Sequence, residues 1–121
     1  MTERVLIVDD HPLTRDALAA LLSQQGFDVV GSAEDGQGAI DEAGTLQPDL
    51  VLLDLTMPGM DGITALPQIR EQAPSCEVVV LTASDAEENL LAAIRAGASG
   101  VAVIRAVTQI EALRAVVDEA L

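Results

Sequence analysis

Short runs of apolar residues alternate along the chain with longer segments whose apolar residues recur at spacings of three and four. Four of the five runs are continuously apolar, which is typical of strands covered on both faces, as in a parallel sheet. The second run alternates and carries Gly31 and Ser32, which suits a strand at a sheet edge. The predicted strands are 5–8, 28–32, 50–53, 78–81 and 101–104.

The longer segments have the periodicity of amphipathic helices. Gly26 and Gly97 stand after the first and fourth of them, in the position where helices commonly end. Pro67 lies near the first turn of the third, where its missing N–H is tolerated or kinks the helix. The apolar stripe of the first comprises Leu13, Ala17, Leu18, Leu21 and Leu22. The other helical segments are 39–46, 63–72, 87–96 and 110–121.

This order of elements predicts one doubly wound α/β domain over residues 1–121, with five strand-then-helix units. Crossovers in such sheets are right-handed in nearly all cases. The flavodoxin-like strand order 2-1-3-4-5 then places strands 5–8 and 50–53 side by side. Ligands bind outside the carboxyl ends of the strands at that switch point.

Acidic residues stand at both of those strand ends, Asp9 and Asp10 after the first run and Asp54 after the third. In the predicted sheet these three carboxylates converge; in the alternative interpretation, Asp9 or Asp10 only caps the helix that starts near Pro12. Converging carboxylates repel one another, and a divalent cation relieves that repulsion. Few, hard, solvent-accessible oxygen ligands select Mg²⁺, and the backbone carbonyl of Thr56 can add another oxygen.

A magnesium ion beside a carboxylate suits phosphoryl transfer, since Asp is a nucleophile that forms acyl phosphates. Thr82, at the end of the fourth run, either offers a hydroxyl to this chemistry or serves as a turn hydroxyl. A flavin is disfavoured because the Asp9–Pro12 loop would repel its phosphate. An aspartate-nucleophile phosphatase needs a second Asp where Thr56 stands. His11 is interpreted as a packing or capping residue, or as a pH-sensitive neighbour of the acids.

Composition narrows the list of partners. The chain has 20 acidic residues against 6 basic ones, all Arg, for a formal charge of −14. This charge disfavours direct binding of nucleic acid or of an anionic membrane. The lone Cys76 indicates a reducing compartment, and no leader or long apolar run is evident, so we expect a cytoplasmic location.

The chain resembles the receiver domain of bacterial two-component response regulators along its whole length. The matching segments, in order, are Val5–Pro12, Asp54–Gly62, Leu81–Ala83 and Ala96–Gly100. The His11-Pro12 pair and the last segment are similar to the NarL/FixJ-type subgroup. Members of that subgroup usually carry a DNA-binding domain after the receiver, so we expect contact with DNA only through an effector domain that is not in this chain.

The resemblance implies a phosphoacceptor function. Asp54 would accept a phosphoryl group from the phosphohistidine of a sensor histidine kinase. Asp9 and Asp10 would hold Mg²⁺ with Asp54 and the Thr56 carbonyl, and Thr82 would contact the phosphoryl oxygen. The change would spread over the fourth helix, fifth strand and fifth helix, where Leu90, Leu91, Ile94, Ala106, Val107 and Ile110 are candidates for a homodimer face.

The chain departs from the family at two positions. Ile104 stands where the family has a Lys, and Val101 where it has a switch aromatic. Arg105 is one residue past the Lys position, which points its side chain to the other face unless the strand has already ended. We therefore expect that Asp54 is phosphorylated but that phosphorylation is only weakly coupled to the surface formed by the fourth helix, fifth strand and fifth helix. The alternative is a pseudo-receiver, a protein-interaction module that works without phosphorylation, or a sequence from which the Lys was removed by design.

Overall fold

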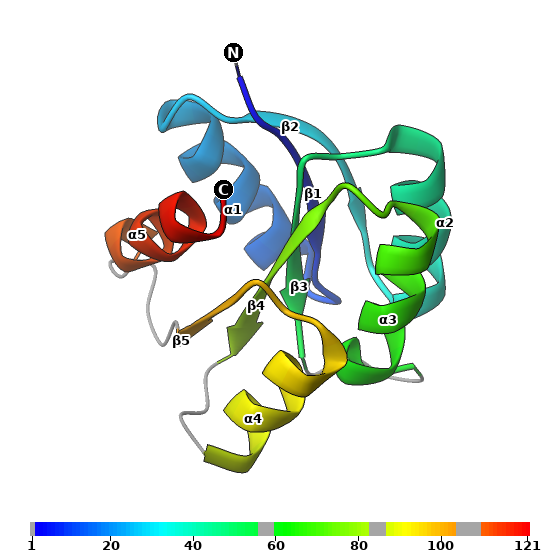
Figure 1. Ribbon diagram of the computed structural model, residues 1–121. Helices are drawn as coiled ribbons and strands as arrows, with labels where there is room; N and C mark the ends of the chain where they lie inside the picture. Colours follow the sequence, from blue (N-terminus) through cyan, green and yellow to red (C-terminus); the bar gives the residue numbers. More distant parts are fainter. Residues whose placement is uncertain (1, 56–59, 83–86, 104–109) are drawn as a thin grey trace.

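The protein is described by a computed structural model that covers residues 2–55, 60–82, 87–103 and 110–121 (Figure 1). Strands and helices alternate through the chain, as the apolar pattern predicts. The strands are β1 (Arg4–Val8), β2 (Asp28–Ala33), β3 (Leu50–Asp54), β4 (Glu77–Thr82) and β5 (Gly100–Val103). The helices are α1 (Pro12–Gln24), α2 (Gly36–Leu46), α3 (Gly62–Gln72), α4 (Glu87–Ala96) and α5 (Ile110–Ala120).

The strands form one parallel sheet in the order β2-β1-β3-β4-β5, which confirms the predicted fold class and strand order. β2 lies at an edge, as its alternating pattern indicates. β1 and β3 are neighbours in the register Val8 opposite Leu53. Their carboxyl ends therefore lie abreast at the switch point of the sheet.

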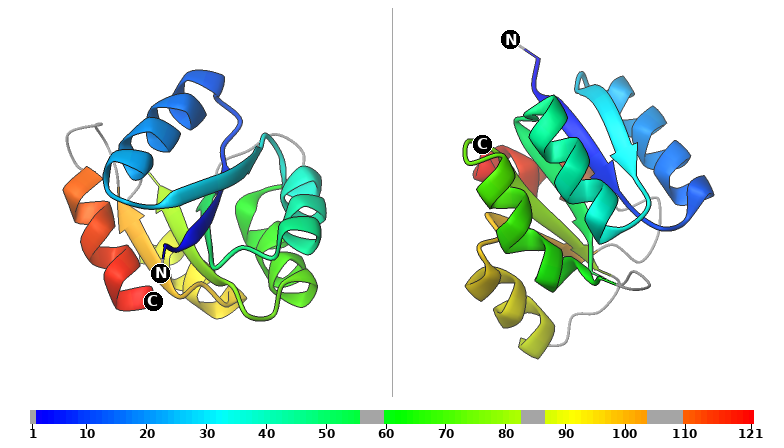
Figure 2. Two further views of the ribbon diagram at one scale, coloured as in Figure 1. Left: turned by 90° about the horizontal axis from the view of Figure 1, so that it is seen from above. Right: turned by 90° about the vertical axis from the view of Figure 1, so that its right-hand side faces the viewer.

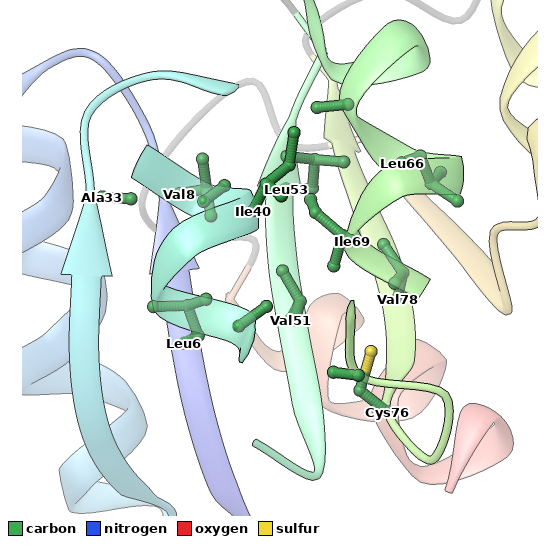
Figure 3. Close-up of a cluster of buried hydrophobic side chains, with 14 of the residues drawn as sticks. Leu6, Val8, Ala33, Ile40, Val51, Leu53, Leu66, Ile69, Cys76 and Val78 are labelled. Atoms are coloured by element: carbon green, nitrogen blue, oxygen red, sulfur yellow. The ribbon is translucent and has the colours of Figure 1, made fainter. Parts of the chain in front are cut away.

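Helices cover both faces of the sheet, with α1 and α5 on one side and α2, α3 and α4 on the other (Figures 1 and 2). Successive strand residues point to opposite faces, so each face has its own core. Leu6, Val8, Val51 and Leu53 pack toward α2 and α3, against residues such as Ile40, Leu66 and Ile69 (Figure 3). Val5, Ile7, Leu50 and Leu52 pack toward α1 and α5, against Leu18, Leu22 and Val117. This two-sided burial explains why four of the strand sequences are continuously apolar.

Three helix ends show how the chain turns back toward the sheet. Gly26 and Gly97 follow α1 and α4 with φ of 92° and 111°, a left-handed conformation that glycine adopts readily. Gln47 takes the same region after α2, with φ of 49°. Its amide Nε2 donates to the carbonyl oxygens of Gly44 and Gln72, both at 2.9 Å, which compensates the strained backbone.

Two details of the helices differ from the predicted pattern. Leu13 belongs to the predicted apolar stripe, but it is 84% exposed, because the first turn of α1 lies past the end of β1 and not over the apolar centre of the sheet. Pro67 lies inside α3 and not in its first turn, and the helix continues through it to Gln72. Leu18 and Leu22 are buried as predicted.

The amino ends of the strands form what we call the anchored edge, which comprises Arg4, Gln47, Asp49, Cys76, Glu77 and Ser99. The backbone N–H of Arg4 donates to Asp49 Oδ2 at 2.8 Å, and the Arg4 guanidinium donates to the Gln47 carbonyl at 3.0 Å. Further along, Ser99 Oγ donates to the Glu77 carboxylate. Polar groups at this edge are thus bonded to one another.

Candidate functional site

The carboxyl ends of β1 and β3 form what we call the acidic edge, which comprises Asp9, Asp10, His11 and Asp54. The β1–β3 register places Asp9, the residue after Val8, abreast of Asp54, the residue after Leu53. One ligand atom from each of the four side chains lies within 4.8 Å of all the others. The structure therefore brings together the three carboxylates whose convergence the strand order predicts, and it adds an imidazole.

Asp9 is fixed by contacts on three sides. Its N–H donates to the Ala33 carbonyl of β2 at 3.1 Å, and its own carbonyl accepts from Arg15 Nη1 at 2.7 Å. Its carboxylate Oδ1 accepts from the backbone N–H of His11 at 2.8 Å. The side chain is only 10% exposed, so this carboxylate is held in place at the rim of the core.

The Asp10 carboxylate has fewer hydrogen bonds than that of Asp9. Its Oδ1 is buried and has no hydrogen-bond partner among the described residues. His11 Nδ1 lies 3.0 Å from that oxygen, at ion-pair distance. Helix α1 begins after His11, which makes no side-chain capping bond, so neither Asp9 nor Asp10 serves as its N-cap residue. The capping interpretation of these two acids is therefore wrong.

Asp54 and Thr82 end two neighbouring strands. Asp54 is opposite Leu81 in the β3–β4 register, so Thr82 is the next residue along, on the strand beside Asp54. The N–H of Leu55 donates to the Leu81 carbonyl at 3.2 Å and keeps the two strands together past Asp54. Thr82 is 8% exposed. The predicted carbonyl ligand of Thr56 and the departures at Ile104 and Arg105 lie outside the described residues.

Gly62, which the sequence analysis names only as the end of the Asp54–Gly62 match, packs against the backbone at the end of β3. A Cβ atom at this position would lie 2.5 Å from the Asp54 carbonyl oxygen, closer than any real Cβ approaches. The N–H of Gly62 donates to the Leu55 carbonyl at 3.2 Å, and Asp61 caps α3 by accepting from the Thr64 N–H at 2.8 Å. The only available signal was the Asp-Gly pair at a helix start.

The donors at the acidic edge fit a divalent cation. Three carboxylates within 4.8 Å repel one another by roughly 1 to 3 kcal/mol per pair at effective dielectric constants between those of water and of a protein surface. A cation would relieve this repulsion and would give the buried Asp10 Oδ1, whose neighbour in the structure is His11 Nδ1 at 3.0 Å, a ligand bond. Hard carboxylate oxygens that are partly open to solvent suit Mg²⁺, which retains several water ligands. Asp9, Asp10 and Asp54 would hold the ion.

Comparison with known proteins gives the class of this fold and site. The family described as "Response regulator receiver domain" matches residues 5–117. The chain belongs to this family.

Individual relatives agree with the family assignment. The nitrate/nitrite response regulator NarL of Escherichia coli K12 is 42% identical over 97 residues, which cover 79% of this chain and 45% of that protein. The chain thus spans about half the length of this curated relative. The signal receiver domain of a putative NarL from Mycobacterium tuberculosis has a TM-score of 0.82 at 35% identity and covers 98% of this chain and 96% of that one.

A second solved structure is similar to the chain. The CheX–CheY–BeF3–Mg²⁺ complex from Borrelia burgdorferi has a TM-score of 0.86 at 31% identity, over 96% of this chain and 87% of that one.

Among the residues that the structure describes, no helix is both long and apolar enough to cross a membrane.

Proposed function

We propose that residues 1–121 act as a phosphoacceptor receiver domain, in which Asp54 accepts a phosphoryl group from the phosphohistidine of a sensor histidine kinase. An Asp54 carboxylate oxygen attacks phosphorus, so that an O–P bond forms and the N–P bond breaks. The electron pair of the N–P bond returns to the kinase imidazole. The observation that carries this proposal is the convergence of the Asp9, Asp10 and Asp54 oxygens within 4.8 Å at the end of a parallel sheet.

Each neighbouring residue has a task in this proposal. Asp9 and Asp10 would hold Mg²⁺ with Asp54 and the Thr56 carbonyl. Arg15 Nη1 donates to the backbone carbonyl of Asp9 at 2.7 Å and so fixes the position of that residue. When bound, Mg²⁺ would neutralise negative charge on the transferring group. Thr82 lies on β4, beside the end of β3 that carries Asp54. Its hydroxyl donates a hydrogen bond to a phosphoryl oxygen once the acyl phosphate has formed.

We also propose that the output surface comprises α4, β5 and α5. Helix α4 exposes Leu91 and Ile94, which are 41% and 58% exposed, and such apolar side chains are suited to a second copy of the chain or to an effector domain. Contact with DNA would be made only by an effector domain outside this chain. The mass of the particle in solution, with and without phosphodonor, tests the homodimer.

Intact-mass measurement tests the phosphoacceptor proposal. The chain is incubated with a small phosphodonor and Mg²⁺, and we expect a mass gain of one phosphoryl group. The gain is lost in Asp54→Asn, and it is retained in the matched control Asp49→Asn, which removes a carboxylate at the opposite end of the same strand. Omission of Mg²⁺ with a chelator slows or abolishes the reaction.

The pseudo-receiver is the competing outcome of the same experiment. No mass gain at any Mg²⁺ concentration, or a gain that survives Asp54→Asn, contradicts the proposal. Val101, where the family has an aromatic, is half-buried and packs against the core on the α2–α4 side of the sheet, which is compatible with a static output surface. A mass gain that leaves the oligomeric state unchanged would indicate phosphorylation without switching.

A further inference from the structure

His11 is the one feature of the acidic edge that a magnesium site does not use. It is the single histidine of the chain. Its Nδ1 lies 3.0 Å from Asp10 Oδ1 and 3.3 Å from Asp9 Oδ1, and it belongs to the set of four ligand atoms that lie within 4.8 Å of one another. The carboxylates therefore have a nitrogen donor close enough to share one ion with them.

The backbone, and not side-chain packing, holds the imidazole there. The N–H of His11 donates to Asp9 Oδ1 at 2.8 Å, and its carbonyl accepts from the Arg15 N–H at 3.0 Å as the first bond of α1. Pro12 follows as the first residue of the helix, where its restricted φ suits the turn. The ring itself is 71% exposed. It can adjust toward an ion without disturbing the core.

A nitrogen donor changes which cations the site prefers. Mg²⁺ takes oxygen ligands and gains little from imidazole. First-row divalent transition cations accept imidazole nitrogen readily, and their affinities for mixed nitrogen and oxygen sites rise along the series toward copper and zinc. The 3.0 Å between His11 Nδ1 and the buried Asp10 Oδ1 is also a spacing that two ligands of one first-row cation can have, since each bond to such a cation is about 2.0 to 2.2 Å long.

We propose that His11 Nδ1, with Asp9, Asp10 and Asp54, forms a site that binds a first-row divalent transition cation more tightly than Mg²⁺. The two kinds of cation compete, because they share the three carboxylates. This inference rests on the metal-binding part of the proposed function and is independent of phosphoryl transfer to Asp54. It also gives His11 a ligand role in place of the packing or capping role that its position at a helix start indicated.

Calorimetric titration of the untagged chain with Zn²⁺ and, separately, with Mg²⁺ tests this inference at about pH 8, where an ordinary imidazole is neutral. We expect Zn²⁺ to bind the wild-type chain more tightly than Mg²⁺. We expect His11→Asn to weaken Zn²⁺ binding about tenfold or more and to change Mg²⁺ binding less than about twofold. The matched control is Asp16→Asn, which removes an exposed charge from α1 outside the cluster and leaves the preference for Zn²⁺ unchanged.

Proton NMR gives a second readout that does not depend on affinity. The ring signals of the single histidine should shift with Zn²⁺, saturate at one equivalent, and return when excess Mg²⁺ displaces the ion. In Asp10→Asn the Zn²⁺-induced shift should require higher concentrations. A site made of the imidazole alone would be indifferent to this substitution.

The outcomes separate the two proposals. If Mg²⁺ binds but His11→Asn leaves Zn²⁺ binding unchanged or makes it tighter, then His11 is at most a counter-ion and this inference alone is overturned. If the wild-type chain binds neither cation, this inference and the metal-dependent part of the proposed function are both overturned.

Discussion

Polar side chains are arranged differently at the two ends of the parallel sheet. At the anchored edge, Asp49 accepts from the Arg4 N–H at 2.8 Å, and Gln47 donates to two carbonyls at 2.9 Å. At the acidic edge, three carboxylates face one another and Asp10 Oδ1 has no hydrogen-bond partner among the described residues. Polar groups at the anchored edge are bonded to one another and stabilise the fold, whereas the acidic edge gathers like charges whose repulsion a bound cation would relieve.

Addition of Mg²⁺ is expected to give the largest effect, and it acts through the acidic edge alone. A ligand that binds only the folded state stabilises it by about 2.7 kcal/mol at a free concentration a hundredfold above its Kd. Urea unfolding with Mg²⁺ or with a chelator measures this difference. We expect Asp9→Asn to lose most of it and Asp49→Asn to retain it. Equal gains in both variants would place the ion elsewhere.

Paired Gly→Ala substitutions compare the rigidity of the two edges. Gly62→Ala places a Cβ 2.5 Å from the Asp54 carbonyl, and overpacking of this kind costs about 1 to 3 kcal/mol. Gly44→Ala, in the interior of α2 near the anchored edge, places a Cβ against the side chain of Gln72 alone, with the tightest contact to its movable Oε1 at 3.2 Å. We expect it to stabilise the protein by about 0.5 to 1 kcal/mol through helix propensity.

Urea unfolding measures both glycine variants, and Mg²⁺ titration adds a further distinction. Gly62→Ala should also weaken Mg²⁺ binding, because the clash is with the backbone of a predicted ligand residue. Gly44→Ala should leave binding unchanged. A neutral Gly62→Ala variant with normal Mg²⁺ binding would contradict this account of the turn.

Removal of one acidic group at each edge should change stability with opposite signs when metal is absent. Asp10→Asn removes a repelling charge from the cluster, so we expect a gain of about 1 kcal/mol in chelator. Asp49→Ala removes the acceptor of the Arg4 N–H, so we expect a loss of about 1 kcal/mol. Chemical denaturation of both variants checks the signs. A destabilised Asp10→Asn variant would mean that this carboxylate is already satisfied.

The smallest expected effect concerns Cys76, a residue of the anchored edge that is 1% exposed. Burial raises the pKa of its thiol, an effect that the nearby Arg70 opposes. The unfolded thiol therefore ionises first, and the associated stability is complete below the unfolded pKa and is lost as pH rises through the folded pKa. At pH 9 we expect wild type to lose about half a kcal/mol relative to Cys76→Ala. Equal pH profiles of the two proteins between pH 7 and 10 would contradict this.

The architecture was predictable because its signals are local and repeated. Continuous apolar runs predict buried parallel strands, and the rule for switch points then predicts that Asp9 lies next to Asp54, as the β1–β3 register confirms. Leu13 was misplaced because helical periodicity does not tell where a helix extends past the sheet beneath it. Gln47 was unforeseen because its left-handed backbone depends on acceptors that α3 provides, at Gln72, 25 residues further along the chain.

The roles of individual side chains at the site were less predictable than its location. Sequence reasoning treated His11 mainly as a packing or capping residue, and only the turn after β1 brings its Nδ1 to 3.0 Å from Asp10. The sequence marks Gly62 only as the end of the Asp54–Gly62 match, because its close approach to the Asp54 carbonyl is a three-dimensional property. Thr82 was singled out correctly as a strand-end residue near Asp54, and its contact with a phosphoryl group stays a prediction.

The sequence by itself determined the elements, the sheet order and which strand ends carry acidic groups, because hydrophobic periodicity and handed crossovers restrict the arrangement strongly. The tertiary structure alone decided which polar atoms find partners. That outcome depends on distances of a few ångströms between segments far apart in the chain, and no local pattern encodes them.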